Sequence, residues 1–136
     1  MIRNWKLMGD IFNEIEKETL EEFVDAIKNN STEHFVSREF KELMRHIEML
    51  IDAGYIKGAE ITFRGDQFYL HLDNPRITLQ GYDFADTVKD KALLNKTLAA
   101  IKEAGLIASF ETIKQFAPVV VKTIAKDLYN RIMHQQ

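Results

Sequence analysis

The amino-acid sequence predicts a mostly helical α+β fold, and two observations lead to this prediction. Apolar residues recur with helical spacing over most of the chain, but they alternate with polar residues over about residues 61–72. The chain has 136 residues, of which 46% are hydrophobic, and this size suits one domain with one core. We therefore expect a single domain over residues 1–136, with a helix-and-hairpin part over 1–90 and a helical extension over 91–136.

Two helices are predicted before residue 30. The first covers residues 3–17, and the apolar face of this helix is formed by Trp5, Met8, Ile11, Phe12 and Ile15. The second is expected to begin after Thr19, because Thr19 and Glu22 have the spacing of a capping box, in which a hydroxyl and a carboxylate each bind a free backbone amide. Asn29, Asn30 and Ser31 are expected to end this second helix.

The third predicted helix has the clearest pattern of the chain. Ser37 suits its N-cap, and Gly54 suits its C-terminal stop, because glycine enters the left-handed region at little cost. Between them, apolar residues follow helical spacing without a break. This apolar face consists of Phe40, Leu43, Met44, Ile47, Leu50 and Ile51.

A β-hairpin is predicted to follow. Residues 61–63 and 68–72 alternate in the manner of strands, and residues 64–67 suit a tight turn. Asn74 and Pro75 are expected to end the second strand. For residues 76–79 two possibilities stay open: a short third strand, or a segment in which Thr78 caps the next helix.

The chain after residue 80 is predicted to be helical. Gly81 would let its helix pack close to a neighbour, and the inner face of that helix continues with Phe84 and Val88. A second helix carries Leu94, Leu98 and Ile101 and is expected to end at Gly105, and Ser109 would cap a third. Pro118 either starts a new helix or kinks a continuous one. The last stretch has an apolar stripe formed by Val120, Val121, Ile124, Leu128 and Ile132.

This order of helices, glycine stop and hairpin is typical of winged-helix domains, which often bind double-stranded DNA through their third helix. The bases Arg38, Lys41 and Arg45 are spaced i, i+3, i+7 along the N-terminal half of that helix, the half that usually enters the major groove. Arg64 at the hairpin turn could reach a phosphate. The sequence therefore predicts a DNA-binding or transcription-regulatory module with these four bases as its contacts.

Charge and spacing favour a different interpretation. The net charge is -3, and residues 10–25 carry -6 of it, so that the rest of the chain is +3. The third helix sums to -1, although phosphate binding depends on a local excess of base. The connection over residues 29–36 is longer than the tight turn of a helix-turn-helix. The alternative is a protein-interaction or adaptor module that does not bind DNA and uses an acidic face (Glu14, Glu18, Glu21, Glu22 and Asp25) or the C-terminal helix, which could also form a homodimer.

Catalytic, metal and membrane functions lack sequence support. The chain has no cysteine, no phosphate-binding glycine loop and no paired histidines, so no catalytic residue, cofactor or metal site is predicted. His46 is expected on the flank of the third helix with one ring nitrogen hydrogen-bonded. No apolar run approaches the length of a membrane span, and no signal peptide is recognisable, so a cytoplasmic location is expected.

Several blocks of sequence also resemble a known family. The blocks RHIEMLIDAGYIKG and RITLQGYDFADTVKD, followed by LLNKT and FETIKQFA, resemble bacterial and phage proteins of domain-of-unknown-function family 2513. The resemblance covers the chain from about residue 40 to its end and the first helix more loosely. It implies a winged-helix-like fold and a phage or mobile-element setting, and it brings no catalytic residues. This chain departs from the family in Leu79 and Leu94, where members tend to have tryptophan, and in a longer segment over residues 19–35.

Overall fold

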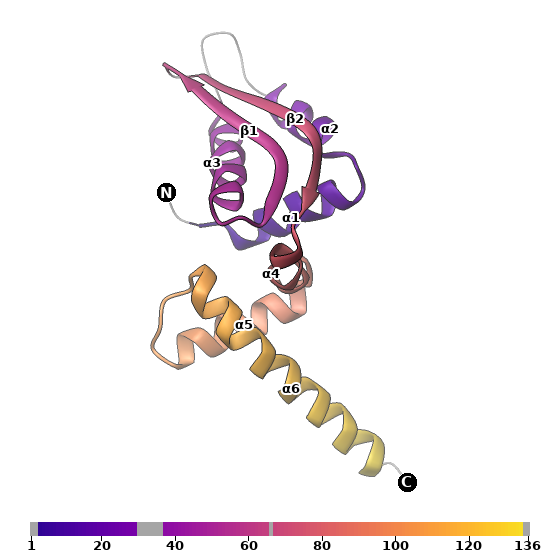
Figure 1. Cartoon of the computed structure of the whole chain (residues 1–136). Coiled ribbons are helices and arrows are strands. Elements are labelled where there is room, and N and C mark those ends of the chain that lie inside the picture. Colours follow the sequence, from indigo (N-terminus) through magenta and orange to yellow (C-terminus); the bar gives the residue numbers. More distant parts are fainter. Residues whose placement is uncertain (1–2, 30–36, 66, 135–136) are drawn as a thin grey trace.

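Six helices and one two-stranded antiparallel hairpin make up the part of the chain that the computed structural model describes, residues 3–29, 37–65 and 67–134 (Figure 1). The mostly helical α+β class is confirmed. The elements in chain order are α1 (Trp5–Glu16), α2 (Leu20–Lys28), α3 (Arg38–Asp52), β1 (Ile56–Arg64), β2 (Gln67–Ile77), α4 (Leu79–Lys89), α5 (Lys91–Glu103) and α6 (Phe110–His134).

The core of the first part lies between α1, α3 and the hairpin. Met8, Ile11 and Phe12 of α1 are fully buried, as predicted from their helical spacing. The predicted apolar face of α3 is also buried, apart from the half-buried Ile51. The hairpin lies across α2 and α3, and its inward residues Leu70 and Leu72 pack against this core (Figure 1). The apolar periodicity of the sequence therefore determined which faces meet.

Local capping signals fix both ends of α3. The Ser37 hydroxyl accepts a hydrogen bond from the Phe40 amide at 3.1 Å, as expected of an N-cap. At the other end Gly54 has φ +77, its amide donates to Ile51, and the Tyr55 amide donates to Leu50 at 3.0 Å. These two bonds form a Schellman motif, so the predicted glycine stop is confirmed.

The predicted capping box at the start of α2 is wrong. Thr19 precedes α2, but its side chain makes no capping bond to that helix. Its hydroxyl instead donates to the Glu14 carboxylate, at the end of α1. The chain turns sharply between α1 and α2, with Glu18 at φ 61, and this turn brings a competing acceptor to the hydroxyl. Asn29 caps the C-terminus of α2, while Asn30 and Ser31 lie outside the described residues.

The hairpin is longer than predicted, because β2 continues through Asn74 and Pro75. Its register pairs Ala59 with Leu72 and then Lys57 with Arg76, and a bulge between these pairs takes up the extra residues. Asn74 has φ 50, a left-handed conformation that asparagine tolerates, and Pro75 has no amide to leave unpaired. The predicted strand end at Asn74 is therefore wrong, because the bulge accommodates Asn74 and Pro75 within β2.

For residues 76–79 the structure decides between the two possibilities that the sequence left open, a third strand or a helix cap. Arg76 and Ile77 extend β2 and form no third strand, since Ile77 pairs with Ile56. Thr78 caps α4, and its hydroxyl accepts from the Gly81 amide at 3.1 Å. A Cβ on Gly81 would lie 2.2 Å from the Tyr55 carbonyl oxygen, so the predicted close packing is confirmed.

An aromatic cluster joins the first part of the chain to the helical extension. Phe84 of α4 stacks on Tyr55 with ring centroids 5.0 Å apart and meets Phe110, the first residue of α6, edge-on at 5.1 Å. The ring of Trp5 in α1 also meets Phe110 edge-on, with the ring centroids 5.5 Å apart. Burial in this cluster, aided by the charge of Glu111, raises the pKa of the Tyr55 hydroxyl. Three helices and the turn after α3, which are distant in sequence, therefore share one apolar centre.

Helix α6 is one helix that contains Pro118, so the proline starts no new helix. Ser109 caps α6 as predicted, since its hydroxyl accepts from the Thr112 amide at 3.1 Å. The first half of α6 packs on α4 and α5, whereas every residue from 121 to 134 is exposed. Figure 1 shows this second half projecting away from the remaining elements.

Candidate functional site

The three candidate bases of α3 lie on one exposed face of that helix. Arg38, Lys41 and Arg45 are all exposed, in agreement with their predicted spacing. The Arg45 guanidinium lies over two aromatic rings near the hairpin tip, 5.1 Å from the centroid of Phe68 and 5.6 Å from that of Phe63. This cation–π contact places the middle of α3 against the end of the hairpin.

Arg64 lies at the same end of the molecule but on the other face of the hairpin. Side chains alternate along a strand, so Arg64 points away from the face that carries Phe63. Its guanidinium lies 5.9 Å from the ring centroid of Tyr69, whose hydroxyl donates to Gln67 at 2.8 Å. The hairpin tip is thus flanked by Arg45 on its inner face and Arg64 on its outer face.

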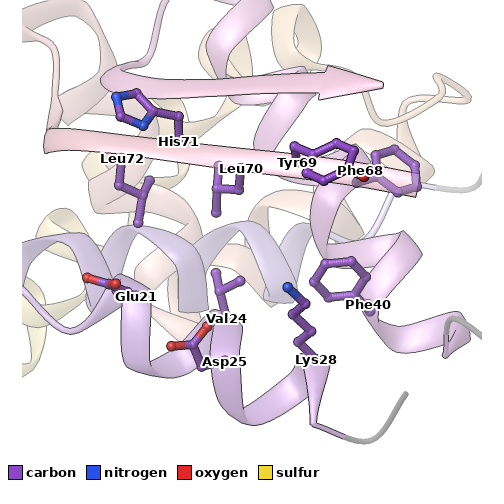
Figure 2. Close-up of a pocket in the computed structure, with 10 residues that line it drawn as sticks. All are labelled: Glu21, Val24, Asp25, Lys28, Phe40, Phe68, Tyr69, Leu70, His71 and Leu72. Atoms are coloured by element: carbon purple, nitrogen blue, oxygen red, sulfur yellow. The ribbon is translucent and has the colours of Figure 1, made fainter. Parts of the chain in front are cut away.

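Lys28, which the sequence did not single out, belongs with these bases. It is the last residue of α2 and lines a groove of about 330 Å³ between α2 and β2, together with Phe40 and Phe68 (Figure 2). Figure 2 shows Leu70 pointing from β2 toward α2, and His71 pointing away. The sequence offered one signal for Lys28, because it places this base at the end of the second predicted helix, shortly before the third. We call Lys28, Arg38, Lys41, Arg45 and Arg64 the basic end.

Acidic side chains near the basic end are partly engaged by other groups. Glu48 forms an ion pair with Arg45 at 3.4 Å, and both side chains are about half exposed. Glu42 accepts a hydrogen bond from the Asn4 side chain at 3.1 Å. Within residues 3–29, 37–65 and 67–134, neither Arg38 nor Lys41 forms an ion pair. Arg38 and Lys41 are therefore the bases of α3 with the most freedom to meet a ligand.

His46 is fully buried, so its expected place on the flank of α3 is wrong. Its Nε2 accepts a hydrogen bond from the Asn4 amide at 2.7 Å, and its Nδ1 donates to the Glu42 carbonyl at 2.7 Å. Both ring nitrogens are satisfied, and the geometry fixes the tautomer with the proton on Nδ1. The imidazole links α1 to α3 and has no free nitrogen for a metal. The described residues contain no cluster of three or more metal-ligating side chains.

The acidic segment, residues 10–25, is only partly available to a partner. Glu16 forms an ion pair with Lys89 of α4, and Glu14 binds the Thr19 hydroxyl. Glu21 and Asp25 remain on the wall of the groove beside β2 (Figure 2). These contacts tie part of the negative charge into the packing of α1, α2 and α4.

A second exposed feature lies at the other end of the molecule. We call the residues Ile113, Ala117, Val121, Ile124, Leu128 and Ile132 the α6 stripe, since their spacing of three or four places them on one helix face. Ile113 and Ala117 are buried, whereas Val121, Ile124, Leu128 and Ile132 are 37 to 56% exposed. Val121, Ile124, Leu128 and Ile132, which the sequence also indicated as an apolar stripe, are therefore not covered by the rest of the chain.

A groove lies at the base of the exposed stripe. Its volume is about 520 Å³, and residues of α4, α5 and α6 line it, among them Phe84, Leu93 and Val121. Asp83 and Asp86 of α4 also line it.

None of the helices within the described residues is long and apolar enough to cross a bilayer.

The architecture defines the structural class of the protein, which is a mostly helical α+β protein with a hairpin beside its third helix. The family model described as "Hypothetical protein (DUF2513)" matches residues 2–107, so the chain belongs to this family of unknown function. The match includes α1, which resembled the family only loosely in the sequence, and it ends before α6, whereas the resemblance seen in the sequence extended to the end of the chain. An "Uncharacterized protein" of Haemophilus influenzae is 23% identical over 121 residues, which cover 89% of this chain and 96% of that protein. No solved structure matches the chain.

Proposed function

We propose that this protein is a non-enzymatic DNA-binding regulatory module of winged-helix type, and that its basic end contacts the duplex. The observation that carries the proposal is the placement of Arg45 on the Phe63 and Phe68 rings. This contact brings the bases of α3 and the hairpin tip to one end of the molecule. The third helix and the wing of a winged helix act together on DNA in such an arrangement.

Four bases of the basic end have a defined role in this proposal. Arg38 and Lys41 are exposed in the first two turns of α3, where the helix would enter the major groove. Arg64, on the outer face of the hairpin, suits a phosphate beside the groove. Arg45 is partly neutralised by Glu48, so it mainly positions the hairpin against α3. Binding would therefore be strongest at low salt, because phosphate contacts release counterions.

The proposal is tested by fluorescence anisotropy with a labelled random-sequence duplex at several salt concentrations. Arg38→Glu combined with Lys41→Glu should weaken binding on the order of tenfold or more at low salt and should lower the salt-dependence slope by about two. Lys96→Glu combined with Lys102→Glu is the matched control, because both residues are exposed on α5 and the charge change is the same. The control should bind as the parent does. A parent that ignores DNA at low salt, or two variants with equal affinity, would refute the assignment.

A second candidate is a protein-interaction module that does not bind DNA. The observation that favours it is the exposed half of the α6 stripe, since contiguous apolar surface on a soluble domain commonly marks a partner site. The anisotropy measurement separates the two candidates. A parent without affinity for the duplex would leave the interaction module as the better account of the fold.

A further inference from the structure

The α6 stripe changes from buried to exposed within a single helix. Ile113 is fully buried and Ala117 is 6% exposed, but Val121 is 48%, Leu128 is 56% and Ile132 is 54% exposed. The change occurs where α6 leaves α4 and α5, and the apolar face itself continues in register. The second half of the helix thus has the surface of a core helix without the elements that would cover it.

An uncovered helix of this length is not expected to be stable by itself. Residues 121–134 extend roughly 20 Å at 1.5 Å per residue. The packed first half of α6 supplies the helix nucleus, but most helical stability in proteins comes from the packing of an apolar face, which these residues lack. Val121 is β-branched and Thr123 and Asn130 are weak helix formers, so propensity gives little help here. A partner that covers the stripe would supply the missing stabilisation.

We infer that this partner is a second copy of the chain, with the exposed half of each α6 lying in the other copy's groove between α4 and α6. The groove offers Leu93, Pro118 and Val121 to an apolar helix face. Its α4 wall carries the carboxylates of Asp83 and Asp86, and its α6 wall carries Lys114 and Lys122. The exposed half of α6 carries Lys122, Lys126 and Arg131 against Asp127, a net charge of +2. The helix and the groove therefore match in apolar character, and the net positive charge of the helix suits the carboxylates of the α4 wall.

Self-docking of this kind is reciprocal. Each copy has one exposed helix half and one groove, and a two-fold axis lets both helices enter both grooves at once. Both stripes are then covered, and no apolar end is left to recruit a third copy. The two stripes meet near Val121, which belongs to the stripe and to the groove.

The same charges argue against a lipid surface as the occupant. A helix that lies on an anionic membrane needs bases along its polar face and no acidic neighbour at the same depth. The groove into which the stripe continues is lined by Asp83 and Asp86 as well as by Lys114 and Lys122, so it offers an anionic surface no excess of base. A second copy places bases at that position instead.

The inference is tested by the mass of the full chain in solution, from light scattering after size exclusion and from sedimentation equilibrium across the micromolar range. The parent should have twice the 15.8 kDa mass of one chain. Leu128→Glu should raise the dimer dissociation constant at least about a hundredfold, because the buried carboxylate would have no partner. The matched control is Asn130→Glu, which adds the same charge on the opposite side of α6 and should remain dimeric.

A second pair of variants tests the groove. Asp83→Lys combined with Asp86→Lys should also weaken the dimer, and far-ultraviolet circular dichroism should show that these variants keep the helices of the rest of the chain. A parent that is monomeric throughout, or a Leu128→Glu variant as dimeric as Asn130→Glu, overturns the inference. So does a monomeric parent that sediments with phosphatidylglycerol vesicles, since the stripe would then bind lipid. The measurement contains no DNA, so its outcome is independent of the proposed function.

Discussion

Asn4 and His46 hold the first helix to the third through a chain of hydrogen bonds. Asn4 caps α1 by accepting from the Leu7 amide at 3.0 Å, and its own amide donates to the His46 ring at 2.7 Å. The His46 ring then donates to the Glu42 carbonyl. These partners lie about forty positions apart in the chain, which is why the sequence indicated only the position of His46 and not its burial.

Thr97 is the residue whose replacement should stabilise the protein. It is fully buried on α5, and its hydroxyl has no hydrogen-bond partner within the described residues. A buried hydroxyl without a partner costs free energy, while valine has nearly the same shape and no polar atom. Thr97→Val should therefore raise the free energy of unfolding by about 1 kcal/mol, as measured by urea unfolding.

Thr87 provides the control for this prediction. It is also a buried helical threonine, but its hydroxyl donates to the Asp83 carbonyl at 3.3 Å. Thr87→Val removes a satisfied hydroxyl and should leave stability unchanged or slightly lower. If both substitutions stabilised the protein equally, the gain would reflect added apolar character rather than the missing bond at Thr97.

At the scale of elements, the close crossing of α1 and α4 depends on Gly9. A Cβ at this position would lie 2.3 Å from the Val88 carbonyl oxygen. Alanine is the better helix former by up to about 1 kcal/mol, so Gly9→Ala would stabilise an uncrowded helix. Here the clash should dominate and lower the free energy of unfolding by roughly 1–3 kcal/mol.

The sign of the effect in a urea titration decides whether the helices are this close. A destabilised Gly9→Ala variant agrees with the crossing, and a stabilised one would show that α4 lies further from α1. The sequence indicated a close approach at Gly81 and did not indicate one at Gly9, because a glycine inside a helix has no local role that reveals its neighbour.

The sequence predicted an element correctly where the residues that determine its ends lie close to it in the chain. Ser37, Gly54 and Gly105 act within one turn of their own helices, and each was predicted correctly. Thr19 was predicted wrongly because Glu14, in the preceding helix, takes its hydroxyl. The strand end at Asn74 was wrong because pairing with β1 carries β2 past it.

The candidate site follows the same rule. The spacing of Arg38, Lys41 and Arg45 was enough to predict that they share an exposed helix face. The contact of Arg45 with Phe63 and Phe68 could not be predicted, because it depends on how the hairpin lies on α3. For the same reason Lys28 joined the basic end only once α2 was placed beside β2.

At the scale of the whole molecule, the basic end and the exposed half of α6 lie at opposite ends (Figure 1). The chain carries a net charge of -3, so its affinity for a polyanion must come from the local arrangement of bases. One basic end offers few phosphate contacts. Two copies joined through α6 would offer twice as many and leave both basic ends free, because the interface lies far from them.

The joined form should bind a long duplex more tightly than a single copy does. Once one basic end is bound, the second copy binds at a high effective concentration, and such linkage commonly raises affinity by a factor on the order of a hundred or more. Leu128→Glu, which should separate the copies, is expected to weaken binding to a duplex long enough for both ends and to leave binding to a duplex that holds one end unchanged. Anisotropy with the two duplexes measures this ratio, and Asn130→Glu should match the parent on both. Equal losses on the two duplexes would place Leu128 in the DNA contact itself, and no loss on either would show that the copies bind DNA independently.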